Sequence, residues 1–238
     1  MNLFIITGTS RGIGFAIANQ ALQQADAKVL GIARTNSISN PRFSFQKVDL
    51  ANADEVNAVV FPPDEGFSKI TLINNAGMLG DVNRLGALAP QSIANTIAVN
   101  LTAPTILMNR FLSAYAQSKG QKVIVNISSG AGRKAISSWS VYCTTKAAID
   151  MLSEAAQQEQ IEQGTSTKIF SVAPGVVDTA MQAGIRSVEK ANFSQLDRFV
   201  ELKQKGLLAS PESIAEKLLL LVEHPQKFSE VIFDVRKF

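Results

Sequence analysis

The chain has 238 residues, 46% of them hydrophobic, which is enough apolar material for one sizeable core but leaves little for a second. We therefore expect one domain that spans residues 1–238. A formal net charge of +3 without a basic cluster argues against nucleic-acid binding, while a small anionic ligand is compatible with it.

The N-terminal sequence MNLFIITG predicts a strand rather than a secretion signal, because it lacks a basic segment and a cleavage site. No apolar run is long enough to span a bilayer, so we expect no membrane association. The only cysteine, Cys143, excludes an intrachain disulfide framework, and we expect a cytoplasmic protein. The only histidine, His224, leaves a Ser-His-Asp triad without its base unless that residue serves, and no zinc-type cluster is present.

Short β-branched runs alternate with amphipathic segments along the chain. The runs predict strands at residues 3–7, 28–33, 43–48, 70–74, 122–128, 168–173 and 230–235. The segments between them predict helices at residues 12–24, 90–117, 141–163 and 211–223. This order predicts an α/β fold, a doubly wound parallel sheet between two helical layers (α/β/α), known as the Rossmann fold. The near-continuous apolar strands agree, because a parallel sheet is covered on both faces.

Three glycines follow the first predicted strand in the sequence TGTSRGIG. They permit a tight turn and close backbone approach, and a helix that begins near Gly12 offers unpaired N–H groups and its positive dipole end to a pyrophosphate. Such glycines can also be plain turn chemistry, but their position after the first strand favours a dinucleotide-binding loop. The residues expected to line it are Gly8, Ser10, Arg11, Gly12, Ile13 and Gly14.

Two arginines bear on which dinucleotide binds. An acidic residue at the end of the second strand would hydrogen-bond the ribose 2′-hydroxyl of NAD, but here that strand ends in Arg34. Arg11 lies directly before the second glycine, and two guanidinium groups suit a 2′-phosphate. We therefore expect NADPH/NADP+ as the cofactor. The alternative is that one or both arginines are solvated surface charges.

Further candidate cofactor residues follow other predicted strands, at the sheet edge where open α/β proteins bind ligands. Asp49 is placed to bond the adenine amino group, and Thr179 is placed for the nicotinamide carboxamide. Small residues after the fourth strand let the backbone approach a ribose. The full set is Asp49, Leu50, Asn75, Ala76, Gly77, Pro174, Gly175, Val177 and Thr179, together with Tyr142 and Lys146.

Tyr142 and Lys146 lie four residues apart in a predicted helix, so they share one face. A phenol, with a pKa of about 10, is a poor acid near neutral pH. A neighbouring ammonium, together with the positive nicotinamide of an oxidised cofactor, would lower that pKa. Tyr142 would then donate a proton to a carbonyl oxygen as hydride reaches the carbon. The alternative is that the pair serves only packing.

Two further polar positions complete the candidate catalytic group. The fifth predicted strand ends in Ser128 and Ser129, and strand alternation predicts that only one of them faces a given pocket, where its hydroxyl would orient a carbonyl. Asn100 lies in an apolar predicted helix and would hold a water that links Lys146 to solvent. Taken singly, Asn100 can simply bond backbone and the serines can cap a turn.

The segment at residues 179–208 combines many charges with apolar residues at roughly helical spacing. We expect it to form a partly mobile helical flap over the carboxyl edge of the sheet. An ordinary pair of surface helices is the alternative.

Together, these motifs resemble the short-chain dehydrogenase/reductase family over nearly the whole chain. TGTSRGIG, NNAG, the helix with Asn100, the serine, Tyr-x-x-x-Lys and the Pro-Gly turn occur in the order of that family. The resemblance implies that Ser129, Tyr142 and Lys146 are a catalytic triad and that Asn100 is its fourth member. The choice of Ser129 over Ser128 rests on the family's spacing between serine and tyrosine. The family also implies a homodimer or homotetramer.

The sequences LINNAGMLGDV, YCTTKAAIDML and APGVVDTAMQ are similar to the sepiapterin reductase branch, and within it to the bacterial benzil reductases. That resemblance implies an NADPH-dependent carbonyl reductase that acts on a ketone or a 1,2-diketone in a flat, apolar pocket. A sepiapterin reductase, whose C-terminal acid would be Asp234, and a non-catalytic NADP-sensing protein are the alternatives. The candidate substrate residues are Ser129, Trp139, Met181 and Asp234, with Met78 and Leu79.

Overall fold

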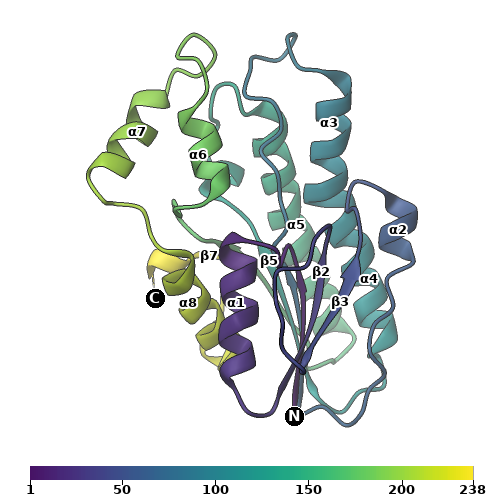
Figure 1. Ribbon diagram of the computed structural model, residues 1–238. Coiled ribbons are helices and arrows are strands. Elements are labelled where there is room, and N and C mark those ends of the chain that lie inside the picture. The colour runs from purple at the N-terminus through teal and green to yellow at the C-terminus, as the bar shows by residue number, and fades with distance from the viewer. Residues whose placement is uncertain (238) are drawn as a thin grey trace.

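A seven-stranded parallel sheet organises the protein in a computed structural model that describes residues 1–237. Its strand order is β3-β2-β1-β4-β5-β6-β7, so the chain winds outward in both directions from β1 and β4. Because all strands are parallel, their carboxyl ends lie at one edge of the sheet, the upper edge in Figure 1. The strands are β1 (Asn2–Thr7), β2 (Ala27–Ala33), β3 (Phe43–Lys47), β4 (Lys69–Asn74), β5 (Gln121–Ile127), β6 (Lys168–Ala173) and β7 (Ile232–Asp234).

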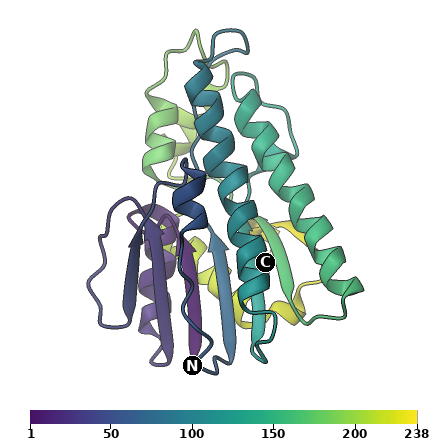
Figure 2. The ribbon, with the colours of Figure 1, turned by 90° about the vertical axis from the view of Figure 1, so that its right-hand side faces the viewer.

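Eight α-helices cover the sheet and its upper edge in the described part of the chain. They are α1 (Gly12–Gln23), α2 (Ala53–Asn57), α3 (Pro90–Ile97), α4 (Ala103–Ala114), α5 (Ser140–Glu162), α6 (Ala180–Arg186), α7 (Leu196–Gln204) and α8 (Pro211–Glu223). Helices α1 and α8 lie behind the sheet in Figure 2, and α2 to α5 lie in front of it. The doubly wound, three-layer prediction is confirmed.

The central strands are apolar because each face of the sheet has its own core. In β1, Phe4 and Ile6 pack against α1 and α8, whereas Leu3 and Ile5 pack against α4 and its neighbours. Successive side chains of a strand point to opposite faces, so both faces require hydrophobic residues. Removing this surface from water is the main favourable contribution to the fold.

The helix predicted at residues 90–117 contains a π-helical turn at Ala98–Thr102, which separates α3 from α4. Pro104 accounts for the break, because it lacks the N–H that an uninterrupted α-helix would donate to the carbonyl of Asn100. Such single π turns occur often at functional sites. This one holds Asn100, which is 2% exposed.

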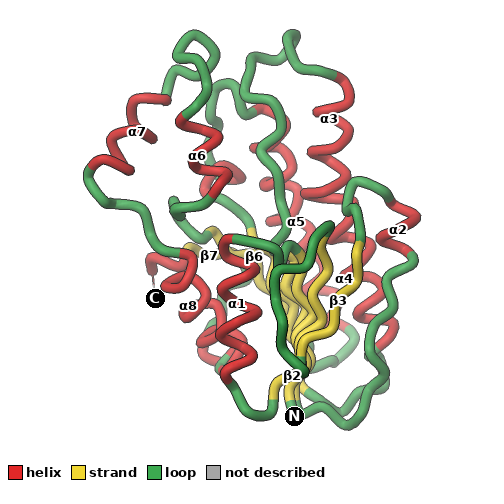
Figure 3. Tube along the Cα trace, viewed as in Figure 1, coloured by secondary structure: helices red, strands yellow, loops and turns green. Residues whose placement is uncertain are grey.

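Helices α6 and α7 lie beyond the carboxyl edge of the sheet, outside the three layers (Figures 1 and 3). They fall within the predicted flap at residues 179–208. Their buried residues Ile185, Phe193 and Phe199 pack with Trp139 and Tyr142 in a separate aromatic cluster. The flap region is therefore anchored by side chains, and a β-bridge between Val177 and Ala209 ties its base. Within residues 1–237, no helix is both long and apolar enough to cross a membrane.

Candidate active site

The loop between β1 and α1 adopts a conformation that glycine makes accessible. Gly8 and Gly12 have φ angles of +75° and +62°, a region that other residues rarely adopt. Helix α1 begins at Gly12, and Arg11 at its N-cap makes no side-chain capping bond. The first turn also has no acidic residue, so its N–H groups and positive dipole end remain available to an anion.

Gly14 is required by close packing rather than by its φ angle. A Cβ there would lie 2.3 Å from Nδ2 of Asn75 and 2.4 Å from the carbonyl oxygen of Gly8. The Asn75 amide occupies this position because it donates to the carbonyls of Thr7, at 2.9 Å, and Gly8, at 3.3 Å. The side chain of Asn75, an expected cofactor residue, thus holds the glycine loop against the end of β4.

Thr7 is a structural residue that the sequence patterns did not single out. Its hydroxyl oxygen accepts the backbone N–H groups of Asn75 and Ala76, both at 3.0 Å. The only signal in the sequence was a polar residue at the end of an apolar strand. Through these bonds the ends of β1 and β4, where the strand order diverges, are fixed to each other.

The remaining candidate cofactor residues line the same edge. Arg11, Arg34 and Asp49 are exposed, and Leu50 is buried beside Asp49. Thr179 lies opposite the glycine loop, because a Cβ on Gly12 would be 3.5 Å from its Cγ2. Residues far apart in the sequence thus meet at the glycine loop. Ser10 and Gly77 lie in the loops after β1 and β4, Ile13 lies in the first turn of α1, and Pro174, Gly175 and Val177 follow β6.

Tyr142 and Lys146 project from the first turns of α5, as the spacing predicts. Both are buried, at 7% and 5% exposure. Lys146 donates through Nζ to the carbonyl of Ile127 at 2.7 Å, and Nζ lies 5.7 Å from the centroid of the Tyr142 ring. The bond to the end of β5 therefore fixes the ammonium beside the phenol.

Burial dominates the acid–base properties of this pair. It raises the pKa of Tyr142 to about 12, and a hydrogen bond with Ser129 acts in the opposite direction. Burial lowers the pKa of Lys146 to about 8, while the charge of Asp150 raises it. The lowered tyrosine pKa expected from the sequence is therefore absent in the protein alone, because desolvation of the phenolate outweighs the hydrogen bond with Ser129.

The two serines at the end of β5 face different surroundings, as strand alternation predicts. Ser128 is buried and donates its hydroxyl to the carbonyl of Lys146 at 3.4 Å. Ser129 is partly exposed, accepts the N–H of Ala131 at 3.1 Å and lowers the pKa of the neighbouring Tyr142 phenol. Of the two, Ser129 is therefore the one beside the candidate acid.

Asn100 is held by the loop after β4. Its Oδ1 accepts the N–H of Met78 at 2.9 Å, and its Nδ2 donates to the carbonyl of Met78 at 2.8 Å and to Thr145 at 3.1 Å. A Cβ on Gly77 would lie 3.4 Å from Oδ1 of Asn100 and 3.7 Å from Nζ of Lys146. Gly77 thus lies against both side chains, which approach the position of its missing Cβ.

Asp150 is a buried charged residue that the sequence patterns did not identify. It lies one turn after Lys146 on α5 and is 5% exposed. Its carboxylate accepts the Ser171 hydroxyl at 2.6 Å and Nε of Arg133 at 3.1 Å. In the sequence, only its spacing of four residues from Lys146 indicated that the two side chains share a helix face. The charge of Asp150 matters to Lys146 because both side chains are buried.

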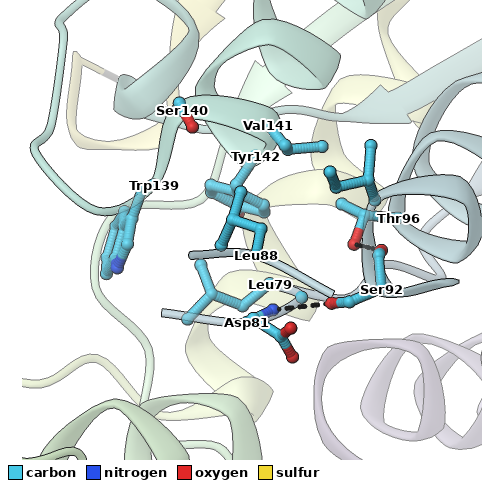
Figure 4. A pocket seen from close by; sticks show the side chains of 11 residues that line it. Leu79, Asp81, Leu88, Ser92, Thr96, Trp139, Ser140, Val141 and Tyr142 are labelled. Atoms are coloured by element: carbon cyan, nitrogen blue, oxygen red, sulfur yellow. Dashed lines mark hydrogen bonds between the residues drawn. The ribbon is translucent and has the colours of Figure 1, made fainter. Parts of the chain in front are cut away.

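A small hollow lies beside Tyr142 (Figure 4). Its internal space of about 10 Å³ is enough for one water molecule. Trp139, whose ring stacks on Phe193 at 5.1 Å, stands at its edge. The residues that line it are Leu79, Gly80, Asp81, Leu88, Ser92, Ile93, Thr96, Trp139, Ser140, Val141 and Tyr142.

Two of the expected substrate residues, Trp139 and Leu79, therefore border this hollow, whereas Met78 and Met181 do not. Met181 is 37% exposed on α6. Asp234 is engaged elsewhere, because its carboxylate accepts Nε of Arg236 at 2.8 Å and Nη2 at 2.6 Å. The guanidinium holds the pKa of Asp234 below its usual value.

Comparison with known proteins agrees with this geometry. The family model for short chain dehydrogenase matches residues 2–190. The chain is 37% identical to benzil reductase ((S)-benzoin forming) of Bacillus subtilis (strain 168) over 100% of both chains, and 33% identical to sepiapterin reductase of Meriones unguiculatus over 92% of this chain and 90% of that one. The solved structure of the KRED1-Pglu enzyme superposes with a TM-score of 0.84 at 30% identity and covers 98% of this chain and 100% of that one. The chain belongs to the short-chain dehydrogenase family of nicotinamide-dependent oxidoreductases.

Proposed function

We propose that the protein is an NADPH-dependent reductase that transfers hydride to a ketone or a 1,2-diketone. A benzil-like aromatic diketone would give the hydroxy ketone. The observation that carries this proposal is the buried Tyr142 phenol beside Ser129 and Lys146, at the same sheet edge as the glycine loop. The 37% identity to a benzil reductase over the full chain supports the substrate class.

The glycine loop fits a dinucleotide. A pyrophosphate would meet the open N–H groups at the start of α1, since no side chain projects from Gly12 and none caps that helix end. Arg11 and Arg34 are exposed at this edge and would pair with a 2′-phosphate. When bound, the reduced nicotinamide supplies the hydride.

Tyr142 handles the proton in the proposed reaction. With a pKa of about 12 the phenol stays protonated near neutral pH, so it is in the form that donates to the substrate oxygen. Lys146, held by Ile127, would stabilise the resulting phenolate through its positive charge. Ser129 would donate a hydrogen bond to the same substrate oxygen and orient the carbonyl.

A sepiapterin reductase is the second candidate, and the 33% identity to such an enzyme favours it. A pterin held by Asp234 would have to compete with the two bonds from Arg236. We therefore rank the diketone first. Asp234→Ala separates the two: selective loss of pterin turnover, beside unchanged benzil turnover, would indicate a pterin site.

The test of the proposed function is NADPH oxidation, followed by absorbance, with benzil, simple aromatic ketones and sepiapterin as substrates. We expect benzil to have the highest kcat/KM of the panel and NADH to support much slower turnover. No turnover of any carbonyl compound, with NADPH still bound, would favour a non-catalytic NADP-sensing protein. Preferred turnover of sepiapterin would favour the second candidate.

A further inference from the structure

Buried polar atoms without a hydrogen-bond partner are concentrated around the candidate active site. Within residues 1–237 there are eight such side-chain atoms, and five of them belong to Trp139 and Ser140, just before Tyr142, or to helix α6. Native proteins leave few buried polar groups unpaired, so a local concentration requires an explanation. The five are Trp139 Nε1, Ser140 Oγ, Gln182 Nε2, Gln182 Oε1 and Arg186 Nη1.

Gln182 is the most informative of these residues because both polar atoms of its amide are unpaired. It lies in α6 and is 3% exposed, while its neighbours Met181 and Ala183 are exposed. The amide therefore points to the inner side of the helix rather than to solvent. Neither amide atom has contact with solvent, so bulk water does not satisfy them in this arrangement.

The position of Gln182 on α6 places it between the two halves of the site. Thr179, at the N-cap of α6, faces Gly12 in the glycine loop. Ile185, one turn after Gln182, packs in the same cluster as Tyr142 and Trp139. Residues three and four apart share a helix face, so the amide lies along the line from the nucleotide loop to the candidate acid.

The side chain of Arg186 indicates which atom of the Gln182 amide is available to a ligand. Arg186 follows Gln182 by four residues, and its guanidinium has donors but no acceptor. Its unpaired Nη1 complements Oε1 of Gln182. The two atoms are not bonded to each other in this arrangement. Once a substrate brings them together, Nε2 would keep two donors, and an acceptor oxygen would complete the site.

We propose that Gln182 recognises the second oxygen of a 1,2-dicarbonyl substrate, with Nε2 as donor and Arg186 holding Oε1. The inference rests on the proposed function. One carbonyl oxygen would face Tyr142 and Ser129, and the adjacent one would face Gln182. The hollow beside Tyr142 holds only about one water molecule, so side chains around it must move to admit an aromatic diketone. A monoketone would leave the amide unpaired, which discriminates against it.

The test compares benzil with deoxybenzoin, which has the same two rings but lacks one oxygen. Gln182→Met keeps the length of the side chain and removes the donor. We expect kcat/KM for benzil to fall about 10–100-fold, mainly through KM, as for loss of a ligand hydrogen bond in a closed site. The value for deoxybenzoin and the dissociation constant of NADPH should stay close to those of the wild type.

Gln204→Met is the matched control, because Gln204 is exposed on α7 and the substitution is the same. Equal losses with both substrates would overturn the inference and assign Gln182 a structural role. A weakened affinity for NADPH would also overturn it, since the amide would then contact the cofactor. If Gln182→Met does not fold, Gln182→Glu is the second test, because it keeps the shape of the side chain and removes the Nε2 donor. It must show the same selective loss of kcat/KM for benzil. Failure of the wild type to reduce benzil would instead refute the proposed function.

Discussion

The glycine loop and the helix pair α6–α7 lie at the same edge of the sheet, but they are built in different ways. In the loop, backbone and side-chain groups are paired: the Asn75 amide bonds Thr7 and Gly8, and the Thr7 hydroxyl bonds the start of the next loop. In the helix pair, both amide atoms of Gln182 and one guanidinium nitrogen of Arg186 are buried without partners.

The difference separates a preorganised region from one that a ligand completes. The loop is fixed by the central strands of the sheet, so its conformation does not depend on what it binds. The helix pair packs through an aromatic cluster, in which Trp139 lies 5.1 Å from Phe193 and 5.3 Å from Phe199. Such contacts are exchangeable for those of an aromatic substrate. Substitutions in the two regions should therefore have different consequences.

The largest effect is expected at Tyr142, where the two regions meet. Tyr142→Phe keeps the ring and its edge contact with Trp139 and removes only the hydroxyl. We expect kcat for benzil to fall about 10²–10⁴-fold, because the general acid is lost. The affinity for NADPH, measured by fluorescence titration, should stay close to that of the wild type, since the glycine loop is untouched. Substantial turnover in this variant would mean that another group donates the proton.

Much of the preorganised region follows from local sequence. Alternating apolar runs predicted the parallel sheet, and the spacing of Gly8, Gly12 and Gly14 predicted the loop at its edge. The spacing of Tyr142 and Lys146 predicted a shared face. These features depend on residues close in the chain, and backbone geometry fixes them.

The remainder depends on contacts between distant segments. The π-helical turn at Asn100 arises where a helix meets Pro104, and periodicity alone predicted one uninterrupted helix. The raised pKa of Tyr142 follows from the depth of burial, which spacing does not specify. Gln182 reads in sequence as an ordinary polar helix residue, and only its 3% exposure makes it a candidate ligand contact.

A smaller effect is expected from reversing a charge at the preorganised edge. Arg34→Asp removes the proposed partner of the 2′-phosphate and introduces an acid suited to a ribose hydroxyl. We expect the ratio of kcat/KM for NADPH to that for NADH to fall about 10–100-fold, as for loss of a charge-assisted bond. Steady-state kinetics with each cofactor measures the ratio.

The control for this charge reversal is Lys227→Asp. Lys227 is exposed and precedes β7, so it lies toward the opposite edge of the parallel sheet. It should leave the cofactor ratio unchanged. An equal loss of activity with both cofactors in Arg34→Asp would contradict the assignment of Arg34 to the 2′-phosphate.

The same substitution in each region tests the contrast in packing. At Gly14 an added Cβ would lie 2.4 Å from the carbonyl oxygen of Gly8, whereas at Gly184 in α6 it would meet nothing within 4 Å. We expect Gly14→Ala to lower the free energy of unfolding by about 1–3 kcal/mol through overpacking. Gly184→Ala should raise it by up to about 1 kcal/mol through helix propensity. Denaturant unfolding measures both, and a loss at Gly184 as large as that at Gly14 would remove the contrast.

The smallest effect is expected in the pH profile of Asp150→Asn. The Asp150 carboxylate favours the ammonium form of Lys146, whose pKa burial lowers to about 8. In the proposed reduction the Lys146 ammonium stabilises the Tyr142 phenolate, so kcat should fall as the pH rises through the lysine pKa of about 8. Removing the carboxylate lowers the lysine pKa further, and we expect the alkaline limb to move down by roughly 1 pH unit. A purely structural role would lower kcat at every pH without moving the limb, and Asp178→Asn, at an exposed site, should change neither.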